Sequence, residues 1–512
     1  MYARAKSLGL IGLETYVVDT EVNLSGDKFN FEIVGLPDTA VKEARERVEA
    51  AVKNSGFNFP YRHITVNLAP ADKRKEGSIY DLPITVALLK AEQIIKANLD
   101  DSAFIGELSL AGDVKGVRGV LPMLLAAKEA GLKKVYIPYP NRAEAQVVDG
   151  VEAFPVQHIG QLVRHLSGEE PLEPVPFGVA DDDAAEDALL DFADVMGQPA
   201  AKRALEIAAA GGHNCLMIGP PGTGKSILAK RLPGILPNMS FAESLETTKV
   251  YSVAGKLPAG RALITTRPFR SPHHSISSPG LAGGGAIPRP GEVSLAHNGV
   301  LFMDELPEFS RSAMEILRQP LEDGRINISR VAGTVSYPCS CMLVAAMNPC
   351  PCGYFGHPSV RCTCTELARA KYLAKVSGPI LDRIDIHVEV GAVNYEQLTS
   401  KTKGERSADV RARVNAAREI QNARFRGTGV TCNAKMTPAM TREYCKLDAD
   451  AEHMLKAVFD RLGLSARAYD KILRLSRTIA DLAGSETISS AHLAEAVQYR
   501  ELDRKYRPGV EV

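Results

Sequence analysis

Residues 215–232 read CLMIGPPGTGKSILAKRL, and this stretch decides the fold of the chain. Its apolar start predicts a buried strand, and the residues after the glycine-rich loop predict a helix. In this setting glycines let the backbone turn tightly, so that its N–H groups surround phosphates. The lysine adds a positive charge, and the serine supplies an oxygen ligand for Mg²⁺. The stretch predicts a phosphate-binding loop (P-loop) formed by Gly219, Pro220, Pro221, Gly222, Thr223, Gly224, Lys225 and Ser226.

Acidic and amide side chains follow two apolar runs downstream of this loop. The run 300–303 predicts a buried parallel strand that directs Asp304 towards Mg²⁺ and Glu305 towards a water molecule. The Glu305 carboxylate is then the expected general base for attack on the γ-phosphate. Asn348 ends the next apolar run, where its amide can orient the attacking water. The alternative for Asn348 is a turn-forming role before Pro349.

The 512-residue chain has an ordinary globular composition and predicts roughly three domains. Its 61 Lys and Arg residues balance 61 Asp and Glu residues, which excludes a uniformly basic nucleic-acid binder but still allows a locally basic channel. The N-terminal apolar run is too short for a secretory signal, and no uncharged apolar stretch reaches about 18 residues. We therefore expect a cytoplasmic protein without a membrane partner.

Two shifts in composition divide the chain into four parts. A proline-rich and then acidic stretch at 169–191 is typical of a linker. Before it, 1–168 alternates strand-like and helix-like runs, as α/β and α+β domains do. The P-loop and the acidic strand belong to 192–391, whereas 392–512 has apolar residues at helical spacing. The expected fold is multidomain α/β, with a parallel-sheet P-loop core and a C-terminal helical lid.

Six of the nine cysteines fall within 26 residues. Two C-x-C pairs separated by nine residues contain Cys350, Cys352, Cys362 and Cys364. Four thiolates on a short loop can close a tetrahedral structural Zn²⁺ site, although C-x-C leaves the sulfurs less room to reach one ion than C-x₂-C does. Free thiols and redox pairing are the alternatives. The other two, Cys339 and Cys341, are expected on one face of a strand as small buried side chains.

These features together resemble the ComM/YifB family of magnesium-chelatase-like AAA+ ATPases. The resemblance runs nearly end to end and includes the P-loop, the pair Asp304 and Glu305, and the stretches SGPILDRIDIHVEV and SARAYDKILRLSRTIADL. It implies ATP and Mg²⁺ as cofactors. Members of this family form homo-hexameric rings and, in its ComM branch, translocate on DNA to drive branch migration.

The same resemblance implies roles for four further side chains. Asn348 is implied as the sensor 1 residue. Arg383 is implied as an arginine finger that acts on the nucleotide of a neighbouring subunit. Arg467 is implied as the sensor 2 arginine, with Arg474 as the alternative if the lid helix is rotated.

Two segments are candidates for DNA contact. The Gly/Pro-rich stretch 265–299 is too long for an ordinary connection. In the family it resembles an insert in the second AAA+ helix that projects towards the ring pore. A predicted hairpin at 323–338, with Asp323 and Gly324 in its turn, is the second segment. The basic residues expected near the insert tip are Arg267, Arg270, His273 and His274, and those expected to be exposed on the hairpin are Arg325 and Arg330.

Both sets of basic residues have simpler explanations. Adjacent histidines such as His273 and His274 can ligate a metal ion, although no Cys or carboxylate stands at ligand spacing nearby. Exposed arginines on a hairpin can be solvated without contacting a partner.

The N-terminal part resembles the Lon protease domain in KEGSIYDLPITVALL and GELSLAGDVKGVRGVLPMLLAAKEAGLKKVYIP. A Ser–Lys dyad needs a serine nucleophile and a lysine base. Ser78 lies one residue from the nucleophile position, and Met123 stands where the lysine should be. A methionine thioether cannot serve as the base. We therefore expect a Lon-like α+β fold with no protease substrate.

The P-loop and the acidic pair predict ATP hydrolysis, and the resemblance implies a ring motor acting on single-stranded or branched DNA. The resemblance implies helicase or branch-migration activity during recombination of incoming DNA in natural transformation. The rival interpretation is a magnesium-chelatase-type or protein-remodelling ATPase. A chelatase partner would need a metal-ion domain with a D-x-S-x-S motif, which this sequence lacks.

Overall fold

The computed structural model describes residues 1–178, 190–285, 288–330, 333–357, 359–392, 404–462 and 465–505. Most of the acidic half of the expected linker, 179–189, lies outside these residues. The chain divides into two compact units. The first consists of 1–181 with two later segments, 244–264 and 335–337, and the second contains the rest. Part of the expected ATPase core therefore packs within the first unit.

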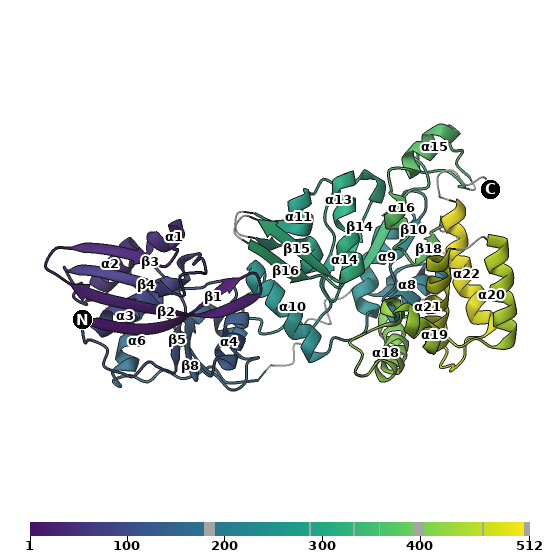
Figure 1. Ribbon diagram of the computed structural model, residues 1–512. Coiled ribbons are helices and arrows are strands. Elements are labelled where there is room, and N and C mark those ends of the chain that lie inside the picture. The colour runs from purple at the N-terminus through teal and green to yellow at the C-terminus, as the bar shows by residue number, and fades with distance from the viewer. Residues whose placement is uncertain are drawn as a thin grey trace. The chain divides into compact units, whose positions relative to one another are not determined.

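The first unit is built on a seven-stranded mixed sheet of order β3-β4-β2-β1-β5-β8-β9 (Figure 1). The first two strands, β1 (Tyr2–Ile11) and β2 (Glu14–Ser25), form a long antiparallel hairpin, and β2 pairs antiparallel with β4. The other pairs in the sheet are parallel. The remaining strands are β3 (Asn30–Val34), β4 (His63–Ala69), β5 (Ser102–Phe104), β8 (Lys134–Pro138) and β9 (Glu152–Val156).

Helices α2 (Ala44–Asn54), α3 (Asp81–Ala91) and α4 (Val120–Glu129) pack in this unit. Helix α3 is buried along almost its whole length because its sequence, DLPITVALLKA, is apolar on every side. Its one buried carboxylate, Asp81, accepts a hydrogen bond from Arg47 Nε at 2.6 Å. Burial raises the pKa of Asp81 to about 6, although the guanidinium opposes this shift.

The later segment 244–264 joins the first unit through a polar contact as well as through packing. Most of α10 (Phe241–Ala254) lies in this segment. Ser252 on α10 donates a hydrogen bond to the buried Glu144 carboxylate at 2.5 Å. The same carboxylate accepts from the backbone N–H of Leu121 at 2.9 Å. A buried carboxylate needs such donors, so this contact ties α10 to the first unit.

The second unit contains a five-stranded parallel sheet of order β11-β14-β17-β10-β18 (Figure 1). Its three central strands are completely buried, as expected for apolar strands covered by helices on both faces. The α/β fold with a parallel P-loop core, predicted from the sequence, is confirmed. The strands are β10 (Cys215–Ile218), β11 (Phe269–Arg270), β14 (Val300–Met303), β17 (Met342–Met347) and β18 (Ile386–Glu389).

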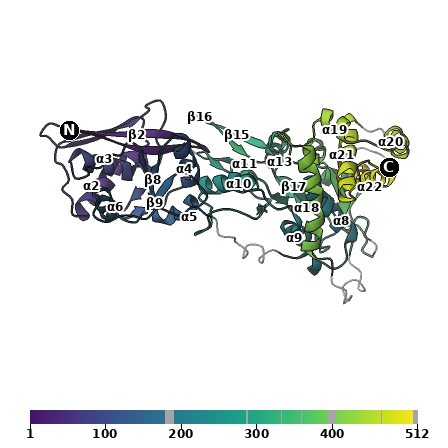
Figure 2. The ribbon, with the colours of Figure 1, turned by 90° about the horizontal axis from the view of Figure 1, so that it is seen from below.

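The C-terminal helices share one hydrophobic core with this sheet. Helix α8 (Pro199–Gly211) contacts β18, α18 and α21, and Figure 2 shows α18 beside α8. The helices are α18 (Ser407–Arg424), α19 (Pro438–Tyr444), α20 (Ala449–Leu462), α21 (Ala466–Leu482) and α22 (Ser490–Lys505). The predicted helical end of the chain is therefore packed on the sheet core. Among the described helices, none combines the length and apolar character that crossing a membrane requires.

A largely buried ion pair fastens α21 to the sheet. Asp385, just before β18, lies 3.0 Å from Lys471 Nζ on α21 and 3.4 Å from His213 Nδ1. Burial would raise the pKa of Asp385, but Lys471 and His213 outweigh it and hold this pKa well below its usual range. The Asp385 charge therefore contributes stability above the pKa of an unfolded Asp, and this contribution is lost as the pH falls through the folded value. Burial lowers the pKa of Lys471, so desolvation of the lysine offsets part of this gain.

Replacing Lys471 by Met should reduce the free energy of unfolding of the second unit by about 3–5 kcal/mol, because Asp385 is left buried without its cation. Urea unfolding followed by circular dichroism measures this change. Lys456→Met, on the exposed face of α20, is the matched control and should change stability by less than about 0.5 kcal/mol. Equal stability of the two variants would contradict the assigned role of the pair.

Candidate active site

The P-loop follows β10 directly and leads into α9 (Lys225–Arg231). Gly222 and Gly224 have φ angles of 79° and 88°, a backbone region that favours glycine. A Cβ atom at Gly219 would lie 2.1 Å from the carbonyl oxygen of Val390, which follows β18. The glycines are therefore required both for the shape of the loop and for its close contact with a neighbouring strand.

The side chains predicted for Mg²⁺ and phosphate lie together beyond the carboxyl ends of β10, β14 and β17. Ser226 Oγ donates a hydrogen bond to Asp304 Oδ2 at 2.5 Å, so both oxygens can face one Mg²⁺ ion. Lys225 Nζ donates to Asn348 Oδ1 at 3.3 Å and to two P-loop carbonyls at 2.7 Å. Burial lowers the pKa of Lys225, and the nearby Asp304 carboxylate opposes that shift. The arrangement is suited to holding a triphosphate with its metal ion.

Glu305 follows Asp304 and lies on the solvent-exposed side of the predicted Mg²⁺ and phosphate residues. Its φ is 53°, an unusual left-handed conformation for a residue other than glycine, and its side chain is 58% exposed. The carboxylate lies 3.3 Å from Nδ1 of His274, whose ring is 4.0 Å from that of His273. The sequence placed His274 near a loop tip, but the structure places it beside the expected general base.

A cavity of about 490 Å³ borders Glu305 and Asn348. Two lysines on and after α15 (Glu366–Leu373), Lys371 and Lys375, line its far side. Lys375 also pairs with Glu308 at 3.0 Å. The sequence analysis missed both lysines. Their four-residue spacing, in a stretch with helix-forming residues, is the signal that could have found them.

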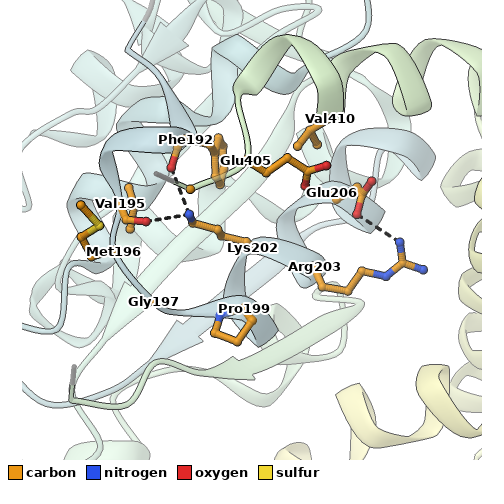
Figure 3. Close-up of a pocket in the computed structure, with 11 residues that line it drawn as sticks. Phe192, Val195, Met196, Gly197, Pro199, Lys202, Arg203, Glu206, Glu405 and Val410 are labelled. Carbon is orange, nitrogen blue, oxygen red and sulfur yellow. Dashed lines mark hydrogen bonds and ion pairs between the residues drawn. The ribbon is translucent and has the colours of Figure 1, made fainter. Parts of the chain in front are cut away.

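A second cavity, of about 530 Å³, lies at the start of α8 (Figure 3). In Figure 3 the Lys202 side chain turns to the backbone, where it donates hydrogen bonds to the carbonyls of Phe192 at 3.0 Å and Val195 at 2.6 Å. Burial lowers the pKa of Lys202. The cavity is lined by Phe192, Val195, Met196, Gly197, Pro199, Lys202, Arg203, Glu206, Gly404, Glu405 and Val410.

Gln198 links this second cavity to the P-loop. Its amide donates to the carbonyl of Thr223 at 3.4 Å and to that of Gly391 at 2.6 Å. Gly197 and Gln198 both have left-handed backbones, with φ of 65° and 59°. The sequence analysis missed this cavity. The available signal was a Gly-Gln pair directly before α8, the helix that precedes the P-loop strand β10.

Arg383 lies in the turn between α16 (Gly378–Leu381) and β18. Its guanidinium donates to the carbonyl of Pro379 at 2.6 Å and forms an ion pair with Glu322. Its Nε is buried and has no hydrogen-bond partner among the described residues. The expected arginine finger is thus held by its own chain, through a glutamate that is itself exposed.

The two sensor 2 candidates on α21 lie in different surroundings. Arg467 is exposed in the first turn of the helix. Arg474, two turns later, donates to Thr441 Oγ1 and to the carbonyl of Ala434, both at 3.2 Å. Arg474 is therefore occupied within the helical domain, while Arg467 faces solvent.

Of the residues predicted to touch DNA, Arg267 and Arg270 lie elsewhere than expected. Arg267 has a side chain that is 14% exposed and pairs with Glu243 at 3.0 Å. Arg270, on β11, pairs with Glu292 at 2.6 Å. Both guanidinium groups are held by carboxylates of this chain, and Arg267 is nearly buried. A sequence pattern alone does not show which carboxylate will reach a basic side chain.

The two strands of the predicted hairpin pair with each other, but Asp323 and Gly324 lie before both strands. Gly324, φ 64°, caps the end of α14 (Arg318–Asp323), so the predicted Asp323–Gly324 turn is wrong. The strands are β15 (Arg325–Arg330) and β16 (Gly333–Pro338), and Arg325 is exposed. The side chain of Arg330 lies outside the described residues.

The structure brings the four predicted metal-ligating cysteines together. One sulfur atom from each of Cys350, Cys352, Cys362 and Cys364 lies within 4.8 Å of every other, which is compatible with a Zn²⁺ site. Cys339 and Cys341 lie between β16 and β17 rather than within a strand. Cys339 is buried and Cys341 half-buried, and burial raises the pKa of Cys341 to about 12.

The two positions of the Lon-like dyad have other surroundings. Ser78 Oγ hydrogen-bonds to the Glu107 carboxylate. Met123, on α4, is 1% exposed and packs in a hydrophobic cluster. The structure thus gives Met123 a packing role in the first unit.

The parallel sheet, the P-loop, the Asp304–Glu305 pair and the packed helical domain define a P-loop ATPase of the AAA+ class. Three family descriptions match the chain. "Magnesium chelatase, subunit ChlI" matches residues 191–398, "Subunit ChlI of Mg-chelatase" matches 20–141, and "Magnesium chelatase, subunit ChlI C-terminal" matches 404–500.

Near full-length relatives refine this class. The chain is 44% identical to the uncharacterized protein YifB of Salmonella typhimurium, over 96% of each chain. It is also 44% identical to the competence protein ComM of Haemophilus influenzae, over 98% of this chain and 97% of that one. A shorter match, 27% identical over 32% of each chain, is to Lon protease 2 of Bacillus subtilis. The chain belongs to the ComM/YifB family of magnesium-chelatase-like proteins.

Changing Glu305 to Gln should leave binding of ATP and Mg²⁺ intact and lower hydrolysis by about 10²–10⁴-fold, because an amide cannot accept the proton of the attacking water. Phosphate release under saturating ATP measures the rate, and a fluorescent ATP analogue measures binding. Glu308→Gln, on a neighbouring carboxylate that also lines the cavity, is the matched control. Wild-type turnover by the Glu305→Gln protein would remove Glu305 from the mechanism.

Proposed function

We propose that the protein is an ATP-hydrolysing, ring-forming motor that acts on single-stranded or branched DNA. The observation that carries the ATPase part is the convergence of Lys225, Ser226, Asp304 and Asn348 beside Glu305. The DNA part rests on the relative named competence protein ComM, because competence concerns the uptake of DNA. Branch migration during recombination of incoming DNA is the activity that combines ATP hydrolysis with action on DNA.

In this proposal the two cavities hold opposite ends of one nucleotide. The cavity at the start of α8 takes the base and sugar, because it joins the P-loop through Gln198 and presents both apolar surface and backbone groups. Lys225 and the P-loop N–H groups hold the phosphates. Asn348 orients the attacking water, and Glu305 accepts its proton. Mg²⁺, when bound by Ser226 and Asp304, neutralises charge that develops on the phosphate oxygens.

Arg383 supplies the arginine finger to the neighbouring subunit of a homo-hexamer. Its ion pair with the exposed Glu322 is worth no more than about 1 kcal/mol, so the phosphates of a neighbour can replace it. Arg467 is free of such a partner among the described residues and serves as sensor 2.

DNA should raise ATP turnover by the wild-type protein, and a labelled four-way junction should be resolved into two duplexes in an ATP-dependent reaction. Single-stranded, duplex and branched DNA are compared at fixed salt, since phosphate contacts weaken as salt rises. Lys225→Ala is the control for contaminating ATPases. Unchanged turnover with every DNA, together with ATP-dependent metal insertion into a porphyrin or remodelling of a protein, would favour the rival chelatase-type or remodelling function.

Mixing inactive Arg383→Ala and Lys225→Ala proteins should restore part of the activity if the finger acts between subunits. Some interfaces then pair an intact P-loop with an intact arginine, and an arginine finger contributes about 10³–10⁵ in rate. Native mass spectrometry confirms that mixed rings have formed. No recovery in mixed rings would mean that Arg383 acts within its own subunit.

A further inference from the structure

The loop between β17 and α15 gathers four sulfur atoms around one point. Cys350 Sγ lies 3.3 Å from Cys352 Sγ and 3.7 Å from Cys362 Sγ, and the last two sulfurs are 3.6 Å apart. The backbone N–H of Cys352 donates to Cys364 Sγ at 3.4 Å. All four sulfurs lie within 4.8 Å of one another.

These distances fit a shared metal ion. Sulfurs held about 2.3 Å from one Zn²⁺ in a tetrahedron are about 3.8 Å from each other. The observed separations are close to that value and much longer than the about 2.05 Å of a disulfide bond. Both C-x-C pairs contribute their sulfurs to this group, although the spacing is narrower than C-x₂-C. Gly353, directly after the first pair, has a φ of 84°, a backbone region that favours glycine.

The surroundings of the cluster suit a bound ion. The backbone N–H of Cys352 donates to the sulfur of Cys364, and an N–H donor of this kind orients a metal-bound sulfur. Cys350 is fully buried and the other three are half-buried, so an ion can enter from the solvent side.

The same loop also forms one wall of the nucleotide site. Asn348 precedes the first ligand by two residues, and Pro351 lines the cavity beside Glu305. A Cβ on Gly353 would lie 2.6 Å from Cδ of Pro221, so the loop packs directly against the P-loop. On the far side, Arg369 of α15 stacks 4.2 Å over the Phe355 ring and fastens the loop to that helix.

We propose that Cys350, Cys352, Cys362 and Cys364 bind one structural Zn²⁺ ion, which holds the loop against the P-loop and fixes Asn348 beside Lys225. Each thiol that enters the site loses its proton, and four thiolates satisfy the tetrahedral preference of the ion. The effect on hydrolysis rests on the proposed ATPase function, whereas the binding of zinc does not.

Elemental analysis of the full chain, purified without chelators, should find about one zinc per chain. Cys362→Ser should remove this zinc, and Cys362→His, which keeps a zinc ligand at that position, should restore it. Cys341→Ser is the matched control, since this nearby half-buried cysteine lies outside the cluster. Cobalt bound in place of zinc should show the visible bands of tetrahedral thiolate coordination, which Cys362→Ser should abolish.

Three outcomes would overturn the zinc assignment: metal content near zero with free thiols, iron in place of zinc, or zinc retained when Cys362 and Cys364 are both replaced by Ser.

If zinc braces the nucleotide site, Cys362→Ser should hydrolyse ATP about 10²-fold more slowly, and Cys362→His should recover most of that loss. Loss of zinc with unchanged hydrolysis would overturn the bracing role. Zinc in a wild-type protein that does not hydrolyse ATP would instead count against the proposed function alone.

Discussion

The parallel pairing of β10 with β17 on one side and β18 on the other is the constraint on which the nucleotide site depends. Parallel strands end at the same edge of a sheet, so whatever follows each strand in sequence is brought to that edge. Ile218 is in register with Met347 and with Glu389, which sets the P-loop beside Asn348 and Val390. The close contact at Gly219 then leaves no room for a side chain.

The helical domain depends on the same sheet through buried charge. Asp385, Lys471 and His213 join α21 to the edge strand β18, and His213 also reaches Thr478 at 2.8 Å. Buried charges are tolerated only with such partners, so the position of α21 is set narrowly. Arg467 stands on this helix, which means that the interaction that fixes α21 also determines where the exposed arginine points.

Two charged groups with proposed catalytic roles already have partners in this structure. Arg383 is paired with Glu322, and Glu305 lies beside His274. Both contacts involve a side chain that is more than half exposed, so water and counter-ions compete for it. Such pairs can be exchanged for a neighbouring subunit or a nucleotide at low cost. We interpret them as resting contacts in a single chain.

The sequence by itself determined the P-loop, the acidic pair, Asn348 and the four-cysteine set, because each consists of residues next to a strand or at a short, fixed spacing. The parallel sheet followed from the same apolar runs. Only the tertiary structure decided that Arg267 and Arg270 are paired with Glu243 and Glu292, since those carboxylates lie 24 and 22 residues away. It also decided that 244–264 packs in the first unit and that the cysteine loop packs, at Gly353, against Pro221 of the P-loop. Contacts of this kind depend on how distant segments fold onto each other, and local spacing carries no information about them.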